Sequence, residues 1–165
     1  DEEEIMEKRI VSGVAYSRDE AKITLLGLPN HPGVSSAIFS RLADANVNVD
    51  MIVQSRARAD DSANMEFTVG KRDAARAVEI VEAAKAEIGY ETLAVNEDVA
   101  KVSVIGVGMR SHAGVAKTMF KALADKGVNI QVISTSEIKI SVLIDAAYTE
   151  LAVRALHAAY GLDKL

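Results

Sequence analysis

The segment HPGVSSAIFSRLADANVNVDMIVQS (31–55) decides the fold, because it recurs without a gap as HAGVAKTMFKALADKGVNIQVISTS (112–136). The two copies share His, Gly, Val and Phe, a Leu-Ala-Asp run, a Val-Asn pair, an Ile and a closing Ser. In each copy, apolar residues at helical spacing follow the glycine, and an alternating pattern follows the Val-Asn pair. A repeated helix-then-strand pattern of this length indicates two copies of one supersecondary unit.

The flanking sequence extends each copy in the same order. An apolar strand pattern precedes each copy, KITLLG (22–27) in the first and KVSVIG (101–106) in the second. The remaining pattern predicts helices at 32–45, 71–88, 114–126 and 146–160, and strands at 47–55, 65–70, 90–98, 128–135 and 138–144. The sequence therefore predicts an α+β fold of two ferredoxin-like βαββαβ units, each with an antiparallel four-stranded sheet and its helices on one face.

The division into domains depends on the N-terminal strand pattern IVSGVAYS (10–17), which a predicted turn at RDE (18–20) ends. The second unit lacks a fourth strand at its C-terminal end, and this segment can supply it. We then expect the first unit, 19–98, to be inserted into the second, which comprises 10–18 and 99–162. The simpler alternative gives each unit the strand that precedes it. Residues 1–9 are expected to form a flexible acidic start.

Composition excludes several classes of function. A net charge of −5 and a pI near 5.2, with Lys and Arg scattered singly, argue against a nucleic-acid binder. Since Cys is absent, disulfides, thiolate zinc sites and cysteine nucleophiles are excluded. No apolar run approaches the roughly 20 residues of a membrane span, and no apolar signal core begins the chain, so we expect a cytoplasmic protein. The histidines stand singly, so neither a metal site nor a cofactor is expected.

The two strand-to-helix corners, LPNHPGVSS (28–36) and VGMRSHAGVAK (107–117), are the candidate binding regions. A helix N-terminus has unpaired N–H groups and a partial positive charge, so it can hold a carboxylate. Gly33 and Gly114 let the backbone approach a ligand. Asn48 and Asn129 add amide donors and acceptors. Together these groups fit a free amino acid.

The corners can also be plain turns. Pro32 is expected to open the first helix, with Asn30 or His31 as its cap, and Ser111 is expected to cap the second helix. No nucleophile and base can be paired from the sequence, so no catalytic residue is assigned. The residues alone therefore indicate two ferredoxin-like units with small-ligand corners.

Three segments that include parts of both repeats resemble the sequences of a known family. GVNIQVISTSEIKISVLI (127–144), VGMRSHAGVAKTMFKALAD (107–125) and SGVAYSRDEAKITLLGLPNHPGV (12–34) resemble the paired ACT modules of aspartate kinase, and the resemblance spans about 10–162. That family phosphorylates aspartate with ATP, on the route to lysine, threonine and methionine. Its kinase domain opens with a Lys-Phe-Gly-Gly-Thr-type motif that this sequence lacks, so the chain alone is not expected to bind ATP or to catalyse.

The resemblance implies two sites for an effector, threonine or lysine or both, between paired modules. The first would use Asn30, His31, Gly33, Val34, Ser35 and Gln54, with Asn129 and Ile130 from a facing second module. The second would use Met109, Ser111, Gly114, Ala116, Ser136 and Glu137, with Val47, Asn48 and Val49 opposite. By this carry-over Gln54 faces a threonine hydroxyl and Glu137 a lysine ammonium.

The resemblance also implies partners and a mode of action. A homodimer through the ACT units is expected, as is a catalytic aspartate kinase subunit or domain. Effector binding would then inhibit the kinase allosterically. Two alternatives are a ligand-independent dimerisation module and a small ferredoxin-like enzyme.

Overall fold

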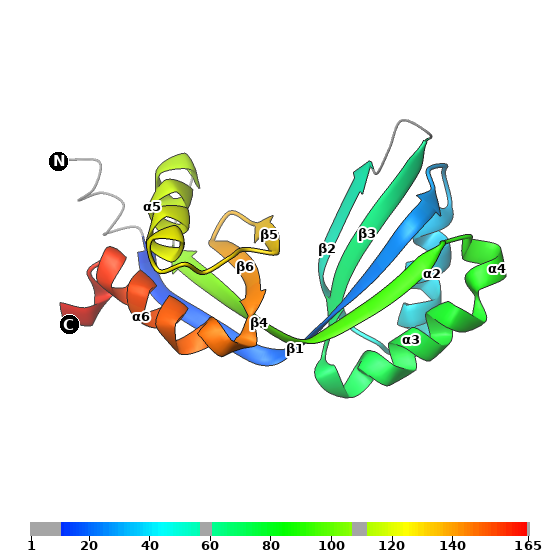
Figure 1. Ribbon diagram of the computed structural model, residues 1–165, viewed down its shortest axis with the longest axis horizontal. Coiled ribbons are helices and arrows are strands. Elements are labelled where there is room, and N and C mark those ends of the chain that lie inside the picture. The colour runs from blue at the N-terminus through cyan, green and yellow to red at the C-terminus, as the bar shows by residue number, and fades with distance from the viewer. Residues whose placement is uncertain (1–10, 57–60, 107–111, 165) are drawn as a thin grey trace. The chain divides into compact units, whose positions relative to one another are not determined.

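The computed structural model describes residues 11–56, 61–106 and 112–164, which divide by their contacts into two compact units (Figure 1). The middle unit comprises Asp19–Glu97. The terminal unit comprises the described residues up to Arg18 and from Asp98 onward. Two long strands, β1 (Val11–Pro29) and β4 (Thr92–Gly106), each give one part to each unit.

The sheet of the middle unit has the strand order β2-β3-β1-β4. Strand β3 pairs antiparallel with both β1 and β2. The elements between β1 and β4 are α2 (Val34–Asp44), β2 (Val49–Arg56), β3 (Ser62–Val69), η1 (Lys71–Asp73), α3 (Ala74–Ala83) and α4 (Lys85–Ile88).

The terminal unit has the order β1-β4-β6-β5, with β6 antiparallel to β4 and β5. Its elements after β4 are α5 (His112–Asp125), β5 (Val132–Thr135), β6 (Lys139–Asp145), η2 (Ala146–Tyr148), α6 (Thr149–Ala159) and η3 (Leu162–Lys164). Both units thus have the ferredoxin-like strand order, and the predicted fold class is confirmed.

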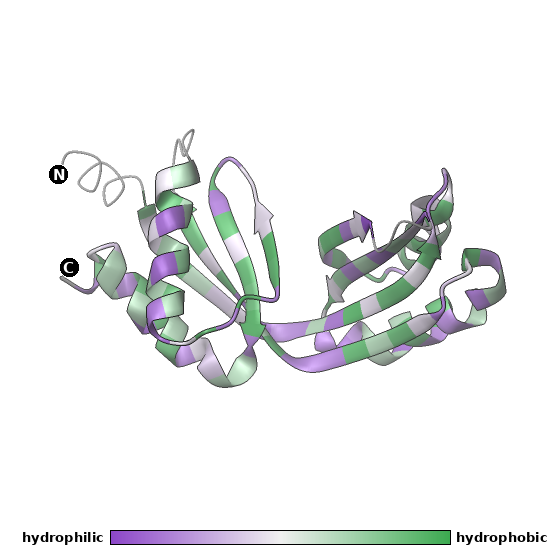
Figure 2. Cartoon of the chain, turned by 45° about the horizontal axis from the view of Figure 1, so that its top comes forward, coloured by the Kyte–Doolittle hydropathy of each residue, from purple (hydrophilic) through white to green (hydrophobic). Residues whose placement is uncertain are grey.

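Each unit buries its own apolar core between one face of its sheet and its helices. In the middle unit, Ile23, Leu25 and Phe67 are fully buried, and Phe39 of α2 meets the Phe67 ring edge-on with centroids 5.4 Å apart. In the terminal unit, Val102 and Val142 belong to the corresponding cluster. Figure 2 shows apolar and polar residues alternating along several strands, the pattern expected of a sheet covered on one face.

The turn predicted at 18–20 is wrong, because β1 runs through it without a break. Charged residues there have partners that hold an extended chain: Asp19 Oδ1 accepts a hydrogen bond from the Lys71 backbone N–H at 3.1 Å. Glu20 is only 6% exposed. Tertiary contacts thus override the local turn signal.

Three other boundaries also differ from expectation. The helix predicted from 71 to 88 is interrupted at Ala84, whose N–H bonds to the Val81 carbonyl, three residues back, at 3.2 Å. The first corner helix begins at Val34, not at Pro32. Strand β5 begins only at Val132, after Gly127 turns the chain with a positive φ of 71°.

That each unit is a separate domain, with the boundaries stated above, remains a prediction. A chain shortened to 19–98 has all four strands of the middle unit, so we expect it to unfold cooperatively in urea. A chain shortened to 99–165 lacks the edge strand of the terminal unit, so we expect it not to unfold cooperatively. A permuted chain in which 10–18 follows 99–165 through a short linker should recover cooperative unfolding. If 99–165 alone unfolds as cooperatively as the permuted chain, the boundaries are wrong.

Candidate functional site

The first corner joins β1 to α2 and leaves the helix N-terminus uncapped. Gly33 is the N-cap residue, with φ 98° and ψ −16°, and as a glycine it has no side chain to cap the first turn. A residue with a Cβ would be strained at that φ, although the space beside Gly33 is open. The backbone N–H groups of the first turn of α2 are therefore available to an anionic group.

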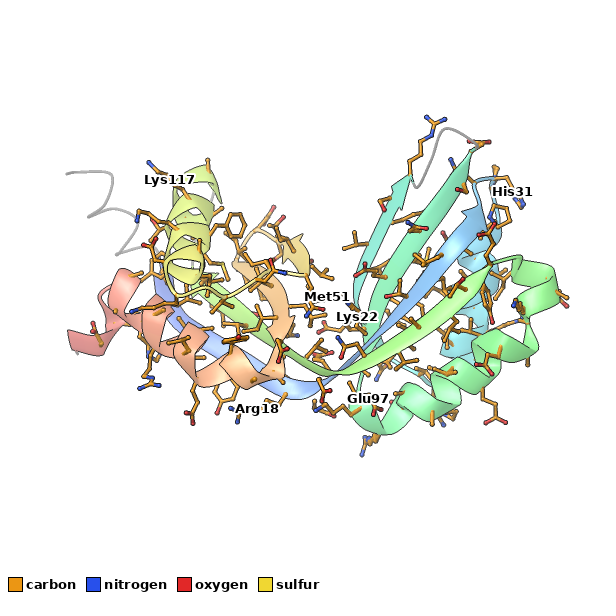
Figure 3. The ribbon with its side chains drawn as sticks, viewed as in Figure 1. Arg18, Lys22, His31, Met51, Glu97 and Lys117 are labelled. Atoms are coloured by element: carbon orange, nitrogen blue, oxygen red, sulfur yellow. The ribbon has the colours of Figure 1, made fainter. Side chains whose placement is uncertain are left out.

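The caps expected for this helix are wrong. The Asn30 amide Nδ2 donates to Asp61 Oδ1 at 3.3 Å, and His31 Nδ1 lies 3.0 Å from the Pro32 carbonyl oxygen. Both side chains are exposed, and Figure 3 marks His31 at this corner. Because both side chains bond elsewhere, neither competes with a ligand for the helix amides.

Gln54 is brought to the same corner by the strand pairing. Strands β1 and β2 both pair antiparallel with β3, so they run parallel, and Leu25 and Gln54 both lie opposite Met65. The Ser35 hydroxyl donates to Gln54 Oε1 at 3.3 Å. The structure thus gathers Gly33, Ser35 and Gln54.

Two groups of expected site residues do not present their side chains at this corner. Val34 is 8% exposed and packs in the core, so only its backbone can face the corner. Val47, Asn48 and Val49 lie at the other end of the sheet, since Val49 and Ala21 both pair with Val69. They cannot serve the corner of their own unit.

The second corner is described in part. Met109 and Ser111 lie outside the described residues, whereas Gly114 and Ala116 stand in the first turns of α5. The Gly106 N–H at the end of β4 donates to the Ile138 carbonyl at 2.8 Å, and the Ser136 N–H donates to the Lys139 carbonyl at 2.8 Å. These bonds place the turn holding Ser136 and exposed Glu137 beside the strand end that leads into the corner.

Asn129 and Ile130 lie away from the second corner. They precede β5, and the next residue, Gln131, donates its backbone N–H to the Leu143 carbonyl at 2.8 Å. Leu143 pairs with Lys101 two residues before the C-terminal end of β6, whereas Lys139 is the first residue of that strand. These residues are therefore at the opposite end of their sheet, as Val47–Val49 are in theirs.

Tyr160 is a supporting residue that the sequence did not reveal. It is 1% exposed, and its hydroxyl donates to the Val115 carbonyl in the first turn of α5 at 2.5 Å. The tyrosine therefore fixes the helix end that follows the second corner. Helical periodicity can predict that Tyr160 is buried, but not which carbonyl its hydroxyl reaches. Asp61 lies in the polar segment RARADDSAN (56–64), which the sequence predicts as a loop, so its bond to Asn30 was not predicted.

Other kinds of site find little support in the described residues. No group of three or more His, Asp or Glu side chains is placed to hold a metal ion within the described ranges. Nor is any helix there long and apolar enough to cross a membrane.

Known proteins similar to this chain agree with its architecture. A family model described as ACT domain matches residues 23–84 and 102–160. The aspartokinase of Pseudomonas aeruginosa is 54% identical over 163 residues, which cover 99% of this chain and 39% of that protein. The regulatory subunit of aspartate kinase from Thermus thermophilus, in a ligand-free form, has a TM-score of 0.85 and 45% identity over 91% of this chain and 98% of its own. A crystal structure of aspartokinase alpha and beta subunits has a TM-score of 0.86 and 45% identity, over 92% of this chain and 99% of that one.

The chain therefore belongs to the ACT-domain family and, within it, to the regulatory subunits and regulatory regions of aspartate kinase. It spans 39% of the length of the Pseudomonas relatives, whose catalytic portion lies elsewhere in those proteins.

We predict that Tyr160→Phe lowers the free energy of unfolding by about 1 kcal/mol, the usual net contribution of one buried hydrogen bond. Urea denaturation measures this. Tyr148→Phe is the matched control, because Tyr148 is 43% exposed and precedes α6. Its effect should stay within about 0.5 kcal/mol. Equal effects of the two changes would show that the buried Tyr160 hydroxyl stabilises the fold no more than an exposed hydroxyl does.

Proposed function

We propose that this chain is the feedback sensor of an aspartate kinase, binding threonine, lysine or both at its corners and inhibiting the kinase allosterically. The observation that carries the proposal is the uncapped N-terminus of α2 at Gly33, with Ser35 and Gln54 beside it. Such a regulator would work in the cytoplasm, together with a catalytic subunit or domain.

The first corner has groups suited to each part of threonine. The amide groups of the first turn of α2 suit the α-carboxylate. The amide of Gln54, now bonded to Ser35 at 3.3 Å, suits the threonine hydroxyl. A bond of that length between exposed groups is weak, so a ligand hydroxyl can replace it at small cost.

The second corner is suited to a longer, cationic side chain. Glu137 is exposed on the turn beside the end of β4, where its carboxylate can pair with a lysine ε-ammonium. The corners differ in sequence, because Pro32 and Ser35 stand where the second repeat has Ala113 and Ala116. We therefore expect different affinities, or different ligands, at the two corners.

The remaining proposed contacts come from a module other than the one that holds the corner. Asn129 and Ile130, and likewise Val47–Val49, lie at the far ends of their own sheets. If they contact an effector at a corner, that corner belongs to a facing module. We propose that this facing module belongs to a second copy of the chain, so that effector binding and homodimer formation are linked. A coupling free energy of about 1–3 kcal/mol between this site and the kinase is enough for useful feedback.

A ligand-independent dimerisation module is the second candidate. It is favoured by the Ser35–Gln54 bond, because the corner side chains can satisfy each other without a ligand. On that account, no amino acid changes the stability of the dimer.

Titration calorimetry of the chain with threonine and with lysine tests the proposal. We expect saturable heat with at least one of them, and a melting temperature that rises with its concentration. Absence of heat and of any thermal shift with both amino acids would support the dimerisation module.

Gln54→Ala and Asn129→Ala test the site residues. Each change removes about one hydrogen bond, so threonine should bind about 3- to 10-fold more weakly. The thermal unfolding of the free chain should be unchanged, because both side chains are exposed. Ser36→Ala is the control on the same helix, since the Ser36 hydroxyl is exposed and lies 3.5 Å from that of Ser40, away from the Ser35–Gln54 pair. Normal threonine binding by both site variants would contradict the assignment.

A further inference from the structure

A shallow hollow of about 390 Å³ lies in the terminal unit, between β1 and the first turns of α6. Tyr16 of β1 lines one side, and Thr149, Glu150, Val153 and Arg154 of α6 line the other. The Thr149 hydroxyl already donates to the Ala146 carbonyl at 2.7 Å. The groups left for an occupant are thus an apolar floor and two charges on the rim. None of the corner residues belongs to it, so effector binding does not account for the hollow.

The repeated fold does not require the two charged residues of the hollow, Glu150 and Arg154. The buried positions of α3 have the same spacing as those of α6: Ala74, Ala77 and Val81 against Thr149, Ala152 and Leu156. By this correspondence, the middle unit has Ala75 where the terminal unit has Glu150, and Glu79 where it has Arg154. The charged rim is therefore particular to the terminal unit.

Tyr16 is exposed in a chain that has few aromatic side chains. The sequence contains 4 Tyr, 3 Phe and no Trp, and Tyr90 and Tyr160 are buried. Tyr16 is 55% exposed, with the Arg18 guanidinium 5.6 Å from the centroid of its ring. Figure 3 marks Arg18 on β1. Tyrosine and arginine together are typical of the residues that dominate binding at protein interfaces.

The charges around the hollow are not paired with each other. Glu150 and Arg154 are one helical turn apart, the usual spacing of an ion pair, yet within the described residues neither takes part in one. The hollow itself has one guanidinium, of Arg154, and one carboxylate, of Glu150; the Arg18 guanidinium lies beside it, over the Tyr16 ring, and adds a second positive charge, whereas the whole chain has a net charge of −5. This local excess of positive charge favours an occupant with carboxylates.

The strand beside the hollow has an open edge. Pairing of β1 with β3 begins only at Ala21, so Val11–Arg18 pairs with β4 on one side and, among the described residues, with no strand on the other. The segment contains no proline, and Arg18 is its one charged residue, so it has few of the features that keep an edge from pairing. Such an edge can accept an extended polypeptide as an added strand.

We propose that this edge and hollow are a docking site for an extended, acidic segment of the kinase portion of the enzyme. The segment adds to β1 as a strand, places one side chain against Tyr16 and Val153, and directs a carboxylate to Arg154. The inference rests on the proposed function, because it assumes a kinase partner.

A polypeptide fits this surface better than a small molecule. Binding sites for small ligands usually bury 70–90% of the ligand, and a hollow bordered by a half-exposed Tyr16 and an exposed Arg154 does not enclose one. A strand partner adds backbone hydrogen bonds along Val11–Arg18, which lie outside the hollow. The kinase portion is the candidate partner because the chain covers only 39% of a similar aspartokinase, and similar alpha and beta subunits have been crystallised together.

Hydrogen–deuterium exchange in the complete aspartate kinase and in this chain alone tests the docking. We expect the backbone amides of Gly13–Tyr16 to exchange at least 10-fold more slowly in the complete enzyme. Arg154→Glu should remove most of that difference. Glu79→Arg, the charge reversal at the matching helix position, should leave it unchanged. Both side chains are exposed, so circular dichroism should confirm that both variants fold.

A photo-crosslinking amino acid, p-benzoylphenylalanine in place of Tyr16, identifies the partner. In the complete enzyme we expect its crosslink to join an acidic peptide of the kinase portion. Equal exchange rates in enzyme and chain, or a crosslink to a second copy of this chain, would overturn the proposal. Effector binding by the chain alone should be the same with and without Arg154→Glu, so failure of the docking is distinct from failure of the sensor function.

Discussion

Pairing between β1 and β4 is the interaction on which both units depend. In the middle unit, the Glu91 N–H donates to the Leu26 carbonyl at 2.8 Å, where the two strands meet. In the terminal unit, the Ser12 hydroxyl donates to the Ile105 carbonyl at 3.2 Å. Neither sheet has its full set of strands without both segments. Helices can bury an apolar face only against a completed sheet, so the corners are held in place by this pairing.

The first corner shows how strand pairing and backbone geometry build a binding surface. A bulge in β1 between Leu25 and Leu28 is stabilised by Asn64, whose Oδ1 accepts a hydrogen bond from the Gly27 N–H at 3.2 Å. Gly27 has a φ of 70° there, and Gly33 turns the chain again into α2. The strand ladder brings Gln54 to the same end of the sheet. Glycine is needed at both turns, because other residues rarely adopt a positive φ.

The repeated pattern of 31–55 and 112–136 was enough to predict the fold, because alternation and helical spacing report directly on buried faces. The continuity of β1 was not predictable, since the Asp19–Lys71 bond that holds its charged segment joins residues far apart in sequence. For the same reason the Tyr160–Val115 bond was missed. Asn30 and His31 were expected as caps from residue type alone, but their side chains bond to Asp61 and Pro32. In the candidate site, the corner motif predicted Gly33, whereas Ser35 and Gln54 were expected only from the family resemblance; strand pairing brings all three to one end of the sheet.

The central claim is that the uncapped N-terminus of α2 receives an amino-acid effector. The most direct test follows the backbone amide signals of the ¹⁵N-labelled chain by NMR during titration with threonine and with lysine. The account predicts saturable shifts of the Gly33, Val34 and Ser35 amides and of the Gln54 side-chain amide, for at least one of the two. Unchanged signals at these positions with both amino acids, at concentrations up to several millimolar, would contradict it.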